Sequence, residues 1–360
     1  MKLSIIYAYR NRDLERIRKS LQSLDDQTDS NFQVYFIDYG SDEARSQKIK
    51  KVCSKFDFIS YNYVPTKFQP WNKSKALNYV IKTLGTEYCF VADVDVIFHP
   101  DFIKKAKKLQ KEDRITYFQV GYLDSQQSKK DLEFSDYQIS RLSTPEATGL
   151  SLFPVEKLKE INGFDEFYHF WGSEDTDIHV RLENAGNEAR FYDEELLLLH
   201  QWHPSYQSQE RTNTLTDLKI SGVLPLNHQH LKTAKELGST KVNLEGWGQC
   251  ITEEESRELK ATEVSFSVTN EKRQVDDILF GQLPGIKNGI IKISFKYDPF
   301  QQSAKYHLKK KLGKKVPHYY TFKEMNDRVI LHLISFYRNL PYSIISNKNK
   351  GEIEIAIKFS

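Results

Sequence analysis

Short apolar runs alternate with helical patterns along the first part of the chain, and this alternation limits the possible folds more than any other feature. Residues 3–8, 32–37 and 88–92 have the character of buried strands. Residues 12–25 and 73–84 place apolar side chains on one helical face. Strands that are apolar on both faces and separated by helices are typical of a mostly parallel sheet covered by helices. We therefore predict a Rossmann-like α/β fold.

The second part of the chain has a different pattern. Around residues 210–260 the sequence becomes polar and rich in turn residues. Three later stretches alternate apolar and polar residues as half-buried strands do: 263–269, 290–297 and 353–359. We predict a boundary near residue 225, with a first domain at 1–225 and a smaller, β-containing accessory domain of unknown role at 226–360.

Positive charge is concentrated at the carboxyl end. From residue 301 onward the chain has twelve Lys and Arg and four acids, a net charge of +8, although the whole chain carries only +3. Five lysines surround Gly313 in what we interpret as a mobile loop: Lys309, Lys310, Lys311, Lys314 and Lys315. This asymmetry favours an anionic partner such as a membrane surface or a polyanionic glycan, and a solvated face of a small domain is the alternative. No nucleic acid partner is expected.

The cysteines and the amino terminus bear on location. Cys53, Cys89 and Cys250 show no disulfide framework and no metal-binding spacing, which favours a reducing compartment. The amino terminus has no signal-peptide pattern, and no apolar stretch approaches the roughly 18 residues that span a bilayer. We expect a cytoplasmic protein that makes, at most, peripheral contact with the inner face of a membrane.

Acidic residues follow two of the predicted strands. Asp38 comes after the second strand, and the Asp-x-Asp triplet at 93–95 comes after the run 88–92. Ligands bind outside the carboxyl ends of such strands. If the last strand continues through the triplet, its two carboxylates share one face, while Val94 and Val96 point into the core. Close carboxylates repel each other unless a cation lies between them, and Mg²⁺ or Mn²⁺ suits oxygen ligands. A polar exit from the strand is the alternative.

A second acidic cluster spans Trp171–Asp177. Ser173 has the character of a helix N-cap, with Glu174 and Asp175 in the first turn. Gly186 would end this helix, whose predicted buried face consists of Ile178, Leu182 and Ala185. A simple helix start does not explain the bulky aromatic side chain next to the acids. An aromatic face for a sugar ring beside a base for its hydroxyl proton does explain it.

Two histidines follow the apolar run 196–199. His200 and His203 are structural residues or, beside an acidic pair, neutral imidazole ligands for a metal such as Mn²⁺. The sequence leaves open which of the two binds the metal.

Several motifs together resemble known glycosyltransferases. Four segments occur in the order seen in β1,4-galactosyltransferases: Arg10-Asn11-Arg12, Trp71–Asn78, Asp93-Val94-Asp95 and Trp171–Asp175. Ile37–Ser41 is similar to the Asp-Asp-Gly-Ser signature of family 2 inverting glycosyltransferases. Arg181–Gly186 and His200-Gln201 resemble bacterial chondroitin-type polymerases. The resemblance covers about residues 1–210 and implies the GT-A fold.

The resemblance also implies a function and a set of roles. It implies a metal-dependent inverting transferase that moves a hexose or N-acetylhexosamine from a UDP-sugar to a hydroxyl of a glycan or lipid-linked acceptor, in surface polysaccharide synthesis. Residues implied to bind the nucleotide are Tyr9, Arg10, Arg12, Asp38, Trp71, Lys73 and Asp93. Asp95 and His200 would bind Mn²⁺ (or Mg²⁺), Trp171 and Glu174 would hold the acceptor and donor sugars, and Asp175 would be the general base.

The chain departs from the families at three positions, and two other functions compete. Ala8 replaces a proline, Tyr39 replaces the second Asp of the family 2 signature, and Lys73 replaces an arginine. One rival is a non-catalytic nucleotide-sugar- or glycan-binding protein of a polysaccharide assembly complex, although a pure binder needs no general base. The other is a nucleotidyltransferase, which also uses acids at strand ends but leaves the motif at 171–177 unexplained.

Overall fold

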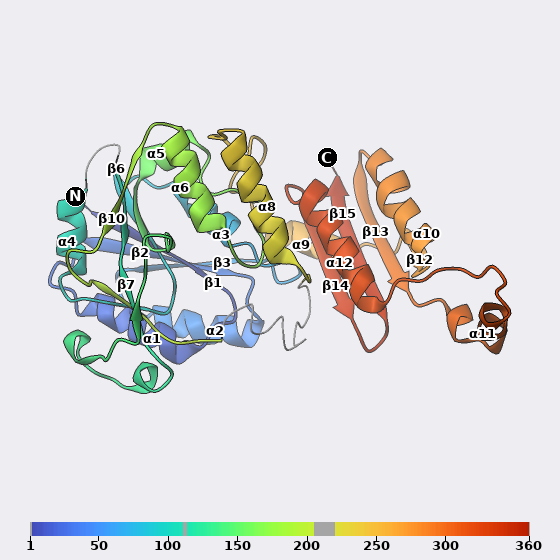
Figure 1. Cartoon of the computed structure of the whole chain (residues 1–360), viewed down its shortest axis with the longest axis horizontal. Coiled ribbons are helices and arrows are strands. Elements are labelled where there is room, and N and C mark those ends of the chain that lie inside the picture. Colours follow the sequence, from blue (N-terminus) through green and yellow to red (C-terminus); the bar gives the residue numbers. More distant parts are fainter. Residues whose placement is uncertain (1, 111–113, 205–219, 360) are drawn as a thin grey trace. The chain divides into compact units, whose positions relative to one another are not determined.

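A computed structural model describes residues 2–110, 114–204 and 220–359, which divide into two compact units (Figure 1). The first unit contains the described residues of 2–67 and 71–204 together with Val223–Gln249, and the second contains Phe68–Pro70, 220–222 and 250–359. The division after Gln249 lies beyond the boundary near 225 that the sequence suggested, because helix α8 (Val223–Glu236) is grouped with the first unit.

A seven-stranded sheet forms the centre of the first unit, in the order β10-β6-β9-β4-β1-β2-β3. Its strands are β1 (Leu3–Tyr9), β2 (Phe32–Tyr39), β3 (Ile59–Val64), β4 (Tyr88–Ala92), β6 (Arg114–Phe118), β9 (Ser151–Pro154) and β10 (Glu188–Tyr192). β1 pairs in parallel with β2 and β4, and β2 pairs in parallel with β3. Only β9 runs antiparallel to its neighbours in this sheet. The mostly parallel sheet and the predicted strands β1, β2 and β4 are confirmed.

Helices cover both faces of this sheet, with α1 and α2 on one side and α3, α5 and α6 on the other (Figure 1). Their bounds are α1 (Leu14–Asp25), α2 (Glu43–Cys53), α3 (Lys73–Ile81), α4 (Phe102–Leu109), α5 (Val155–Glu160) and α6 (Glu174–Asn184), with short 3₁₀ turns η1 (Gln127–Lys129) and η2 (Phe134–Asp136). Asp13 caps α1 by accepting from the amides of Glu15 and Arg16, and Asn72 caps α3. The caps fix where both helices begin.

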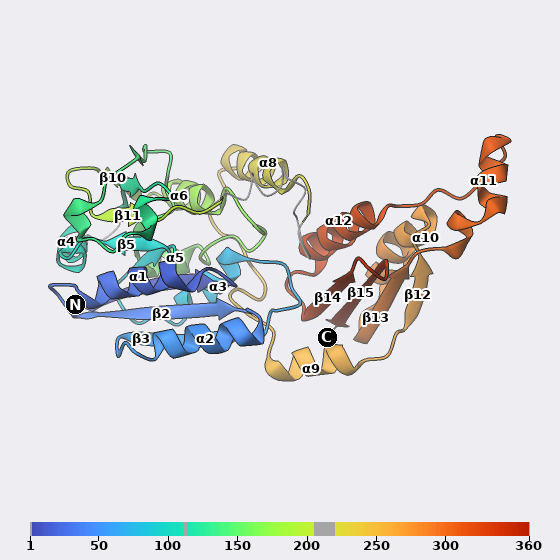
Figure 2. The same ribbon diagram turned by 90° about the horizontal axis from the view of Figure 1, so that it is seen from below.

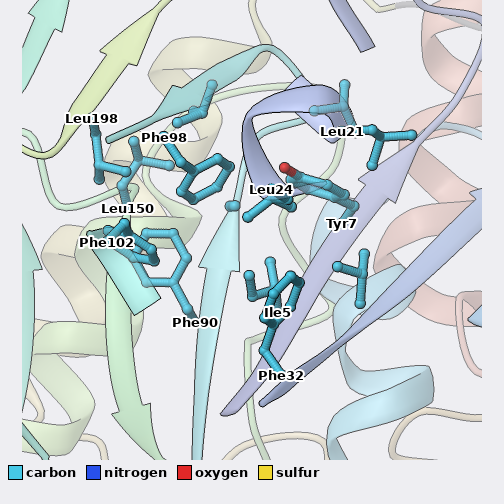
Figure 3. Close-up of a cluster of buried hydrophobic side chains, with 14 of the residues drawn as sticks. Ile5, Tyr7, Leu21, Leu24, Phe32, Phe90, Phe98, Phe102, Leu150 and Leu198 are labelled. Atoms are coloured by element: carbon cyan, nitrogen blue, oxygen red, sulfur yellow. The ribbon is translucent and has the colours of Figure 1, made fainter. Parts of the chain in front are cut away.

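A cluster of buried apolar side chains packs between β1, β4 and the helices around them (Figure 3). The ring of Phe90 contacts those of Phe98 and Phe102 at centroid distances of 6.1 and 4.8 Å. The one polar group of Tyr7 is satisfied, because its hydroxyl lies 2.7 Å from that of Ser20. This packing holds the carboxyl ends of β1 and β4 in fixed positions.

A second, small sheet of the first unit joins distant parts of the sequence. Its order is β5-β11-β7-β8, with β5 (Val96–Phe98), β7 (Val120–Tyr122), β8 (Arg141–Leu142) and β11 (Leu198–His200). β11 pairs antiparallel with β5 in a register that sets His200 opposite Val96. This pairing brings the predicted metal histidine beside the Asp-x-Asp triplet.

The second unit is built on a four-stranded sheet in the order β12-β13-β15-β14. Its strands are β12 (Phe266–Thr269), β13 (Gly289–Lys296), β14 (Tyr342–Asn347) and β15 (Glu352–Phe359), so the three strands predicted there are confirmed and β14 was missed. The Ile344 amide donates to the carbonyl of Phe68, and the Gln69 side chain donates to that of Tyr342, both at 2.8 Å. Phe68–Pro70 therefore belongs to this unit.

Helices lie on both sides of this second sheet, with α10 and α12 on one side and α9 on the other (Figure 2). The helices and turns are α9 (Glu253–Ala261), α10 (Lys272–Asp276), η3 (Asp277–Gln282), η4 (Leu283–Gly285), η5 (Pro299–Gln302), α11 (Ala304–Lys311), α12 (Phe322–His332) and η6 (Leu333–Tyr337). Lys309, Lys310 and Lys311 form the last turn of α11, so the expected mobile loop is wrong for these three lysines. No helix in the described part of the chain is long and apolar enough to cross a bilayer.

Candidate functional site

The Asp-x-Asp triplet forms a turn and not the continuation of a strand. β4 ends at Ala92, and Asp93–Asp95 connects it to β5. Val94 and Val96 are buried, as predicted. The side chain of Asp93 is 40% exposed and that of Asp95 only 8%. The turn gives the two carboxylates different environments and different partners.

Asp95 lies beside both candidate histidines. Its Oδ1 is 3.5 Å from Nε2 of His200, and its Oδ2 is 3.3 Å from Nε2 of His203. One ligand atom from each of these three residues lies within 4.8 Å of the others. Burial lowers the pKa of His203, which favours the neutral imidazole that binds metals. The structure thus places both histidines in one cluster with Asp95.

An unsatisfied oxygen indicates what this cluster accommodates. Asp95 Oδ1 is buried and has no hydrogen-bond donor among the described residues. A buried carboxylate oxygen without a partner is costly, and a divalent cation removes that cost. Two imidazoles and a carboxylate are suitable ligands for Mn²⁺. The residues present therefore fit a divalent metal.

Arg16 and Gln201 support the cluster, and the sequence analysis missed both. Arg16 Nη1 lies 3.5 Å from Asp95 Oδ2. The Gln201 side chain donates to the backbone carbonyls of Arg16 (2.9 Å) and Asp95 (3.2 Å), which ties α1 to the turn. The available signal was the position of Gln201 directly after His200. Arg16 gave none, because it reads as one of several charges on a surface helix.

Lys73, the first residue of α3, connects the turn to the second acidic motif. Its Nζ lies 2.9 Å from Asp93 Oδ1 and 3.7 Å from Glu174 Oε1. Burial alone would lower the pKa of Lys73, but the charges of Asp93 and Glu174 outweigh burial and raise it. For Asp93, burial would raise the pKa, but Lys73, His200 and Arg12 lower it. Both groups are therefore held in their charged forms.

Glu174 behaves differently. Burial and the neighbouring charge of Asp175 raise its pKa from 4.5 to about 7, although Lys73 opposes the shift. A carboxyl group that exchanges its proton near neutral pH is a frequent feature of active sites.

The loop before α6 has an unusual backbone. Phe170, Gly172 and Ser173 all have positive φ angles, of 66°, 98° and 74°. Positive φ is uncommon for residues other than glycine and persists where surrounding contacts impose it. Here Asn227 of α8 donates to the carbonyls of His169 (3.2 Å) and Trp171 (3.0 Å). The loop presents the side chain of Trp171, which is 43% exposed.

The first turn of α6 contains three carboxylates in different surroundings: Glu174, Asp175 and Asp177. Ser173 occupies the N-cap position, as predicted, but its side chain makes no capping hydrogen bond. Asp177 is fully buried and accepts from Arg181 Nε (2.6 Å) and from the Tyr168 hydroxyl (3.2 Å), so it is structural.

The rest of α6 largely follows the prediction. The helix ends at Asn184, before Gly186 at φ +87°. Ile178 and Leu182 are buried as predicted, but Ala185 is exposed, because it follows the last helical turn.

A hollow of 270 Å³ lies over the amino end of α6. Its lining includes Trp171, Glu174 and Asp175 from this motif, and His228 and Leu231 from α8. Gly149 approaches the carboxylate of Asp175, since a Cβ atom at Gly149 would be 3.1 Å from Asp175 Oδ2. The sequence analysis missed the α8 residues, because that region reads as polar and loosely patterned.

Four of the residues predicted to bind the nucleotide lie at or just after the ends of β1 and β2: Tyr9, Arg10, Arg12 and Asp38. Asp38 is fully buried, and its carboxylate accepts from the Ser41 amide (2.9 Å) and from the Tyr61 hydroxyl (2.8 Å). It therefore orders the turn at Gly40, where φ is +77° and a Cβ atom would be 2.3 Å from the Lys67 nitrogen. Asp38 has no exposed surface, so direct contact with a base requires this turn to move.

The arginines of the first loop differ in their surroundings. The guanidinium of Arg10 donates to the carbonyls of Tyr39 and Thr66 and lies 5.9 Å from the ring centre of Trp71, which is half-buried. Arg12 is exposed, and Tyr9 is buried beneath it with its hydroxyl 3.4 Å from the Arg12 carbonyl. Arg12 and Trp71 offer surface to a ligand, while Arg10 holds the loops together.

Two known sequence families match the first unit. Residues 4–152 match the family described as glycosyl transferase family 2, and residues 130–201 match the family described as the N-terminal domain of galactosyltransferase. No curated protein matches the chain.

Solved structures of Staphylococcus aureus TarS are also similar. The crystal structure of TarS 1–349 has 16% sequence identity and a TM-score of 0.43, with 59% of this chain and 63% of that chain covered. The crystal structure of TarS has 15% identity and a TM-score of 0.44, with coverages of 71% and 46%. The complex of TarS 1–349 with UDP has 16% identity and a TM-score of 0.42, with coverages of 71% and 77%. The match thus spans less than two thirds of the first two structures.

Proposed function

We propose that the first unit is a family 2-like glycosyltransferase domain with the GT-A fold, and that the protein transfers a hexose or N-acetylhexosamine from a UDP-sugar to a hydroxyl of a glycan or lipid-linked acceptor, with inversion. One observation carries the proposal. Lys73, within 4 Å of both Asp93 and Glu174, links the turn that carries Asp93 and Asp95 to the hollow beside Asp175. The binding sites for a donor diphosphate and an acceptor sugar would therefore adjoin each other.

The donor is held between the cluster and the first loop. Asp95, His200 and His203 would hold Mn²⁺ or Mg²⁺, and the bound metal would neutralise charge on the diphosphate of UDP. Lys73 adds a positive charge on the same side, and Asp93 binds the ribose or a water. Tyr9, Arg10, Arg12, Asp38 and Trp71 form the nucleotide subsite, with Arg12 and Trp71 in direct contact and the others shaping the loops.

The acceptor is activated by Asp175. The acceptor hydroxyl gives its proton to Asp175 as its oxygen forms a bond to the anomeric carbon and the bond from that carbon to the diphosphate oxygen breaks. A single displacement inverts the anomeric configuration, so an α-linked donor gives a β-linked product. Trp171 supplies an aromatic face for the acceptor ring, and Glu174 binds the sugars at the reaction centre.

The three carboxylates at the start of α6 are not equivalent as bases. Asp177 is bound to Arg181 inside the protein, and Glu174 lies beside Lys73 with a raised pKa. Glu174 and Asp175 both line the hollow where an acceptor hydroxyl has access, but Lys73 lies 3.7 Å from Glu174 Oε1. We therefore assign the base to Asp175.

A screen of UDP-sugars tests the proposal. We expect at least one of them to give UDP release and a glycosylated product with Mn²⁺, and neither with a chelator. Binding of UDP-sugars without any turnover, across a broad acceptor panel, would favour the rival of a non-catalytic binding protein.

The second unit suggests where the enzyme works. We propose a role in surface polysaccharide synthesis in the cytoplasm, at the inner face of the membrane. The last turn of α11 carries Lys309, Lys310 and Lys311, and two leucines nearby are largely exposed, Leu308 at 59% and Leu312 at 60%. Lysines beside exposed leucines match an anionic lipid surface.

A further inference from the structure

We infer that helix α8 is the outer wall of the acceptor subsite and selects an uncharged sugar unit through His228 and Leu231. The inference rests on the proposed function and extends it to residues outside both matched families, because those matches end at residue 201. The helix spans Val223–Glu236 in the first unit.

Helical spacing places the relevant residues of α8 on one stripe. Leu224, Asn227, His228 and Leu231 follow each other at intervals of three, one and three residues, so their side chains share one face of the helix. Asn227 on this stripe is buried, His228 is exposed and Leu231 is half-buried. The stripe is therefore buried at Asn227 and exposed at His228, and the hollow lies beside His228 and Leu231.

The buried part of the stripe fixes α8 to the Trp171 loop. Asn227 donates to two carbonyls of that loop, and a Cβ atom at Gly172 would be 3.0 Å from Leu224 Cδ2. One turn on, the ring of His230 stacks on Phe167 with ring centres 4.0 Å apart. These contacts hold His228 and Leu231 in a defined position relative to Trp171.

The lining of the hollow fits one sugar ring. Trp171 offers an aromatic face and Leu231 an apolar one, while the His228 imidazole provides hydrogen bonds for ring hydroxyls. The volume of 270 Å³ lies just below the range of about 300–1,000 Å³ that sites for drug-sized ligands span. A single sugar ring therefore fits in it.

Charge restricts the sugar further. Glu174 and Asp175 lie on the same wall as Trp171, and Lys73 lies beside Glu174, so a uronic acid would bring its carboxylate against that of Asp175. Like charges in such proximity are strongly unfavourable. The hollow therefore favours hexose and N-acetylhexosamine acceptors over uronic acids.

Substitutions on α8 test the inference. His228→Ala and Leu231→Ala should each raise the KM for a neutral oligosaccharide acceptor about five- to tenfold, the loss of about one hydrogen bond or one apolar contact. The KM for the UDP-sugar should stay within about twofold. Gln229→Ala is the matched control, since Gln229 is exposed on the same helix and does not line the hollow. Melting temperatures of all variants should match the wild type.

The outcomes separate this inference from the proposed function. An unchanged acceptor KM in both α8 variants, with transfer intact, overturns the role of α8 and leaves the transferase. A uronic acid acceptor preferred over neutral ones overturns the charge argument. If the wild type transfers no sugar at all, ligand-detected NMR with neutral oligosaccharides of hexose and N-acetylhexosamine units tests the role of α8 directly. Binding that is lost in His228→Ala and kept in Gln229→Ala supports α8 as a wall of the acceptor subsite. Equal binding in the two variants overturns it.

Discussion

Lys73 Nζ lies 3.7 Å from Glu174 Oε1, and the two residues are the first residues of helices α3 and α6. A carboxylate is favoured at a helix amino end, but an ammonium there opposes the helix dipole. Lys73 is nevertheless held in its charged form, because Asp93 and Glu174 surround it. The arrangement places a positive charge between the turn at Asp93–Asp95 and the hollow at the start of α6, where we propose that the diphosphate lies.

Removing this charge should weaken donor binding. We expect Lys73→Met to raise the Kd for UDP about tenfold, measured by calorimetry, because an ammonium that contacts phosphate oxygens is lost. Lys73→Arg should retain most of the affinity, since the charge remains. Lys48→Met, at an exposed position on α2, is the control. UDP binding that is as strong in Lys73→Met as in the wild type would place the diphosphate elsewhere.

Both histidines should contribute to metal binding. Asp95→Ala, His200→Ala and His203→Ala should each weaken Mn²⁺ binding by about tenfold or more, since each removes one ligand of the cluster. His307→Ala, an exposed histidine on α11, should have no effect. Titration of Mn²⁺ followed by electron paramagnetic resonance measures this directly. If His203→Ala binds Mn²⁺ normally, His203 is not a ligand and only the pair proposed from the sequence remains.

Loss of the base should separate chemistry from binding. Asp175→Asn keeps the shape of the side chain, so transfer should fall by about 10²–10⁴-fold while the Kd for UDP stays near that of the wild type. Asp177→Asn should instead lower the melting temperature, because it leaves the buried charge of Arg181 without its partner. A comparable loss of UDP affinity in Asp175→Asn would show that Asp175 holds the donor and is not the base.

Glu174 should make stability depend on pH. Its pKa rises from 4.5 to about 7 on folding, so the folded protein keeps a proton that the unfolded chain releases. The free energy of unfolding should therefore fall as the pH rises from about 4.5 to about 7, by an amount on the order of 1–3 kcal/mol. Urea denaturation of the metal-free protein at pH 5 and pH 8 measures the difference. Glu174→Gln should lose this part of the pH dependence, and an unaltered profile in that variant would contradict the raised pKa.

The basic helix of the second unit should bind anionic vesicles. Vesicles that contain phosphatidylglycerol should sediment the wild type at low salt, and reversal of Lys309, Lys310 and Lys311 to Glu should release it, at about 1 kcal/mol per lysine. Leu308→Ser with Leu312→Ser should weaken binding less and make it more sensitive to salt. Turnover of a short water-soluble acceptor should stay the same. If the wild type does not sediment with such vesicles, α11 is a solvated helix that binds no membrane.

The sequence predicted the parts of the fold that depend on local pattern. β1 and β4 were recognisable because their residues are apolar on both faces of the sheet. The turn at Asp93–Asp95 was not recognisable, because an Asp-x-Asp pattern fits a continuing strand as well as a turn. Only the structure, through the partners of each carboxylate, distinguishes the two. His200 and Asp95 meet only through the pairing of β11 with β5, which a sequence does not specify.

Polar residues with buried roles were the hardest to predict. Asn227 has the residue type of a surface position, yet it is buried and donates a hydrogen bond to the Trp171 loop. Because the sequence around it is polar and rich in turn residues, α8 was assigned to a loosely structured region. Arg16 was overlooked for the same reason. In both cases the partner is a backbone carbonyl or a carboxylate from a distant segment, and residue type alone carries no information about it.

A cut after Gln249 does not separate the two units, because Phe68–Pro70 belongs to the second. Such a truncation leaves the carbonyl of Phe68 and the side-chain amide of Gln69 without the β14 groups that they contact. An exchange of the carboxyl-terminal unit between related genes must therefore carry along Phe68–Pro70, which lie in the connection between β3 and α3. We expect the two units to be inherited and recombined as one block.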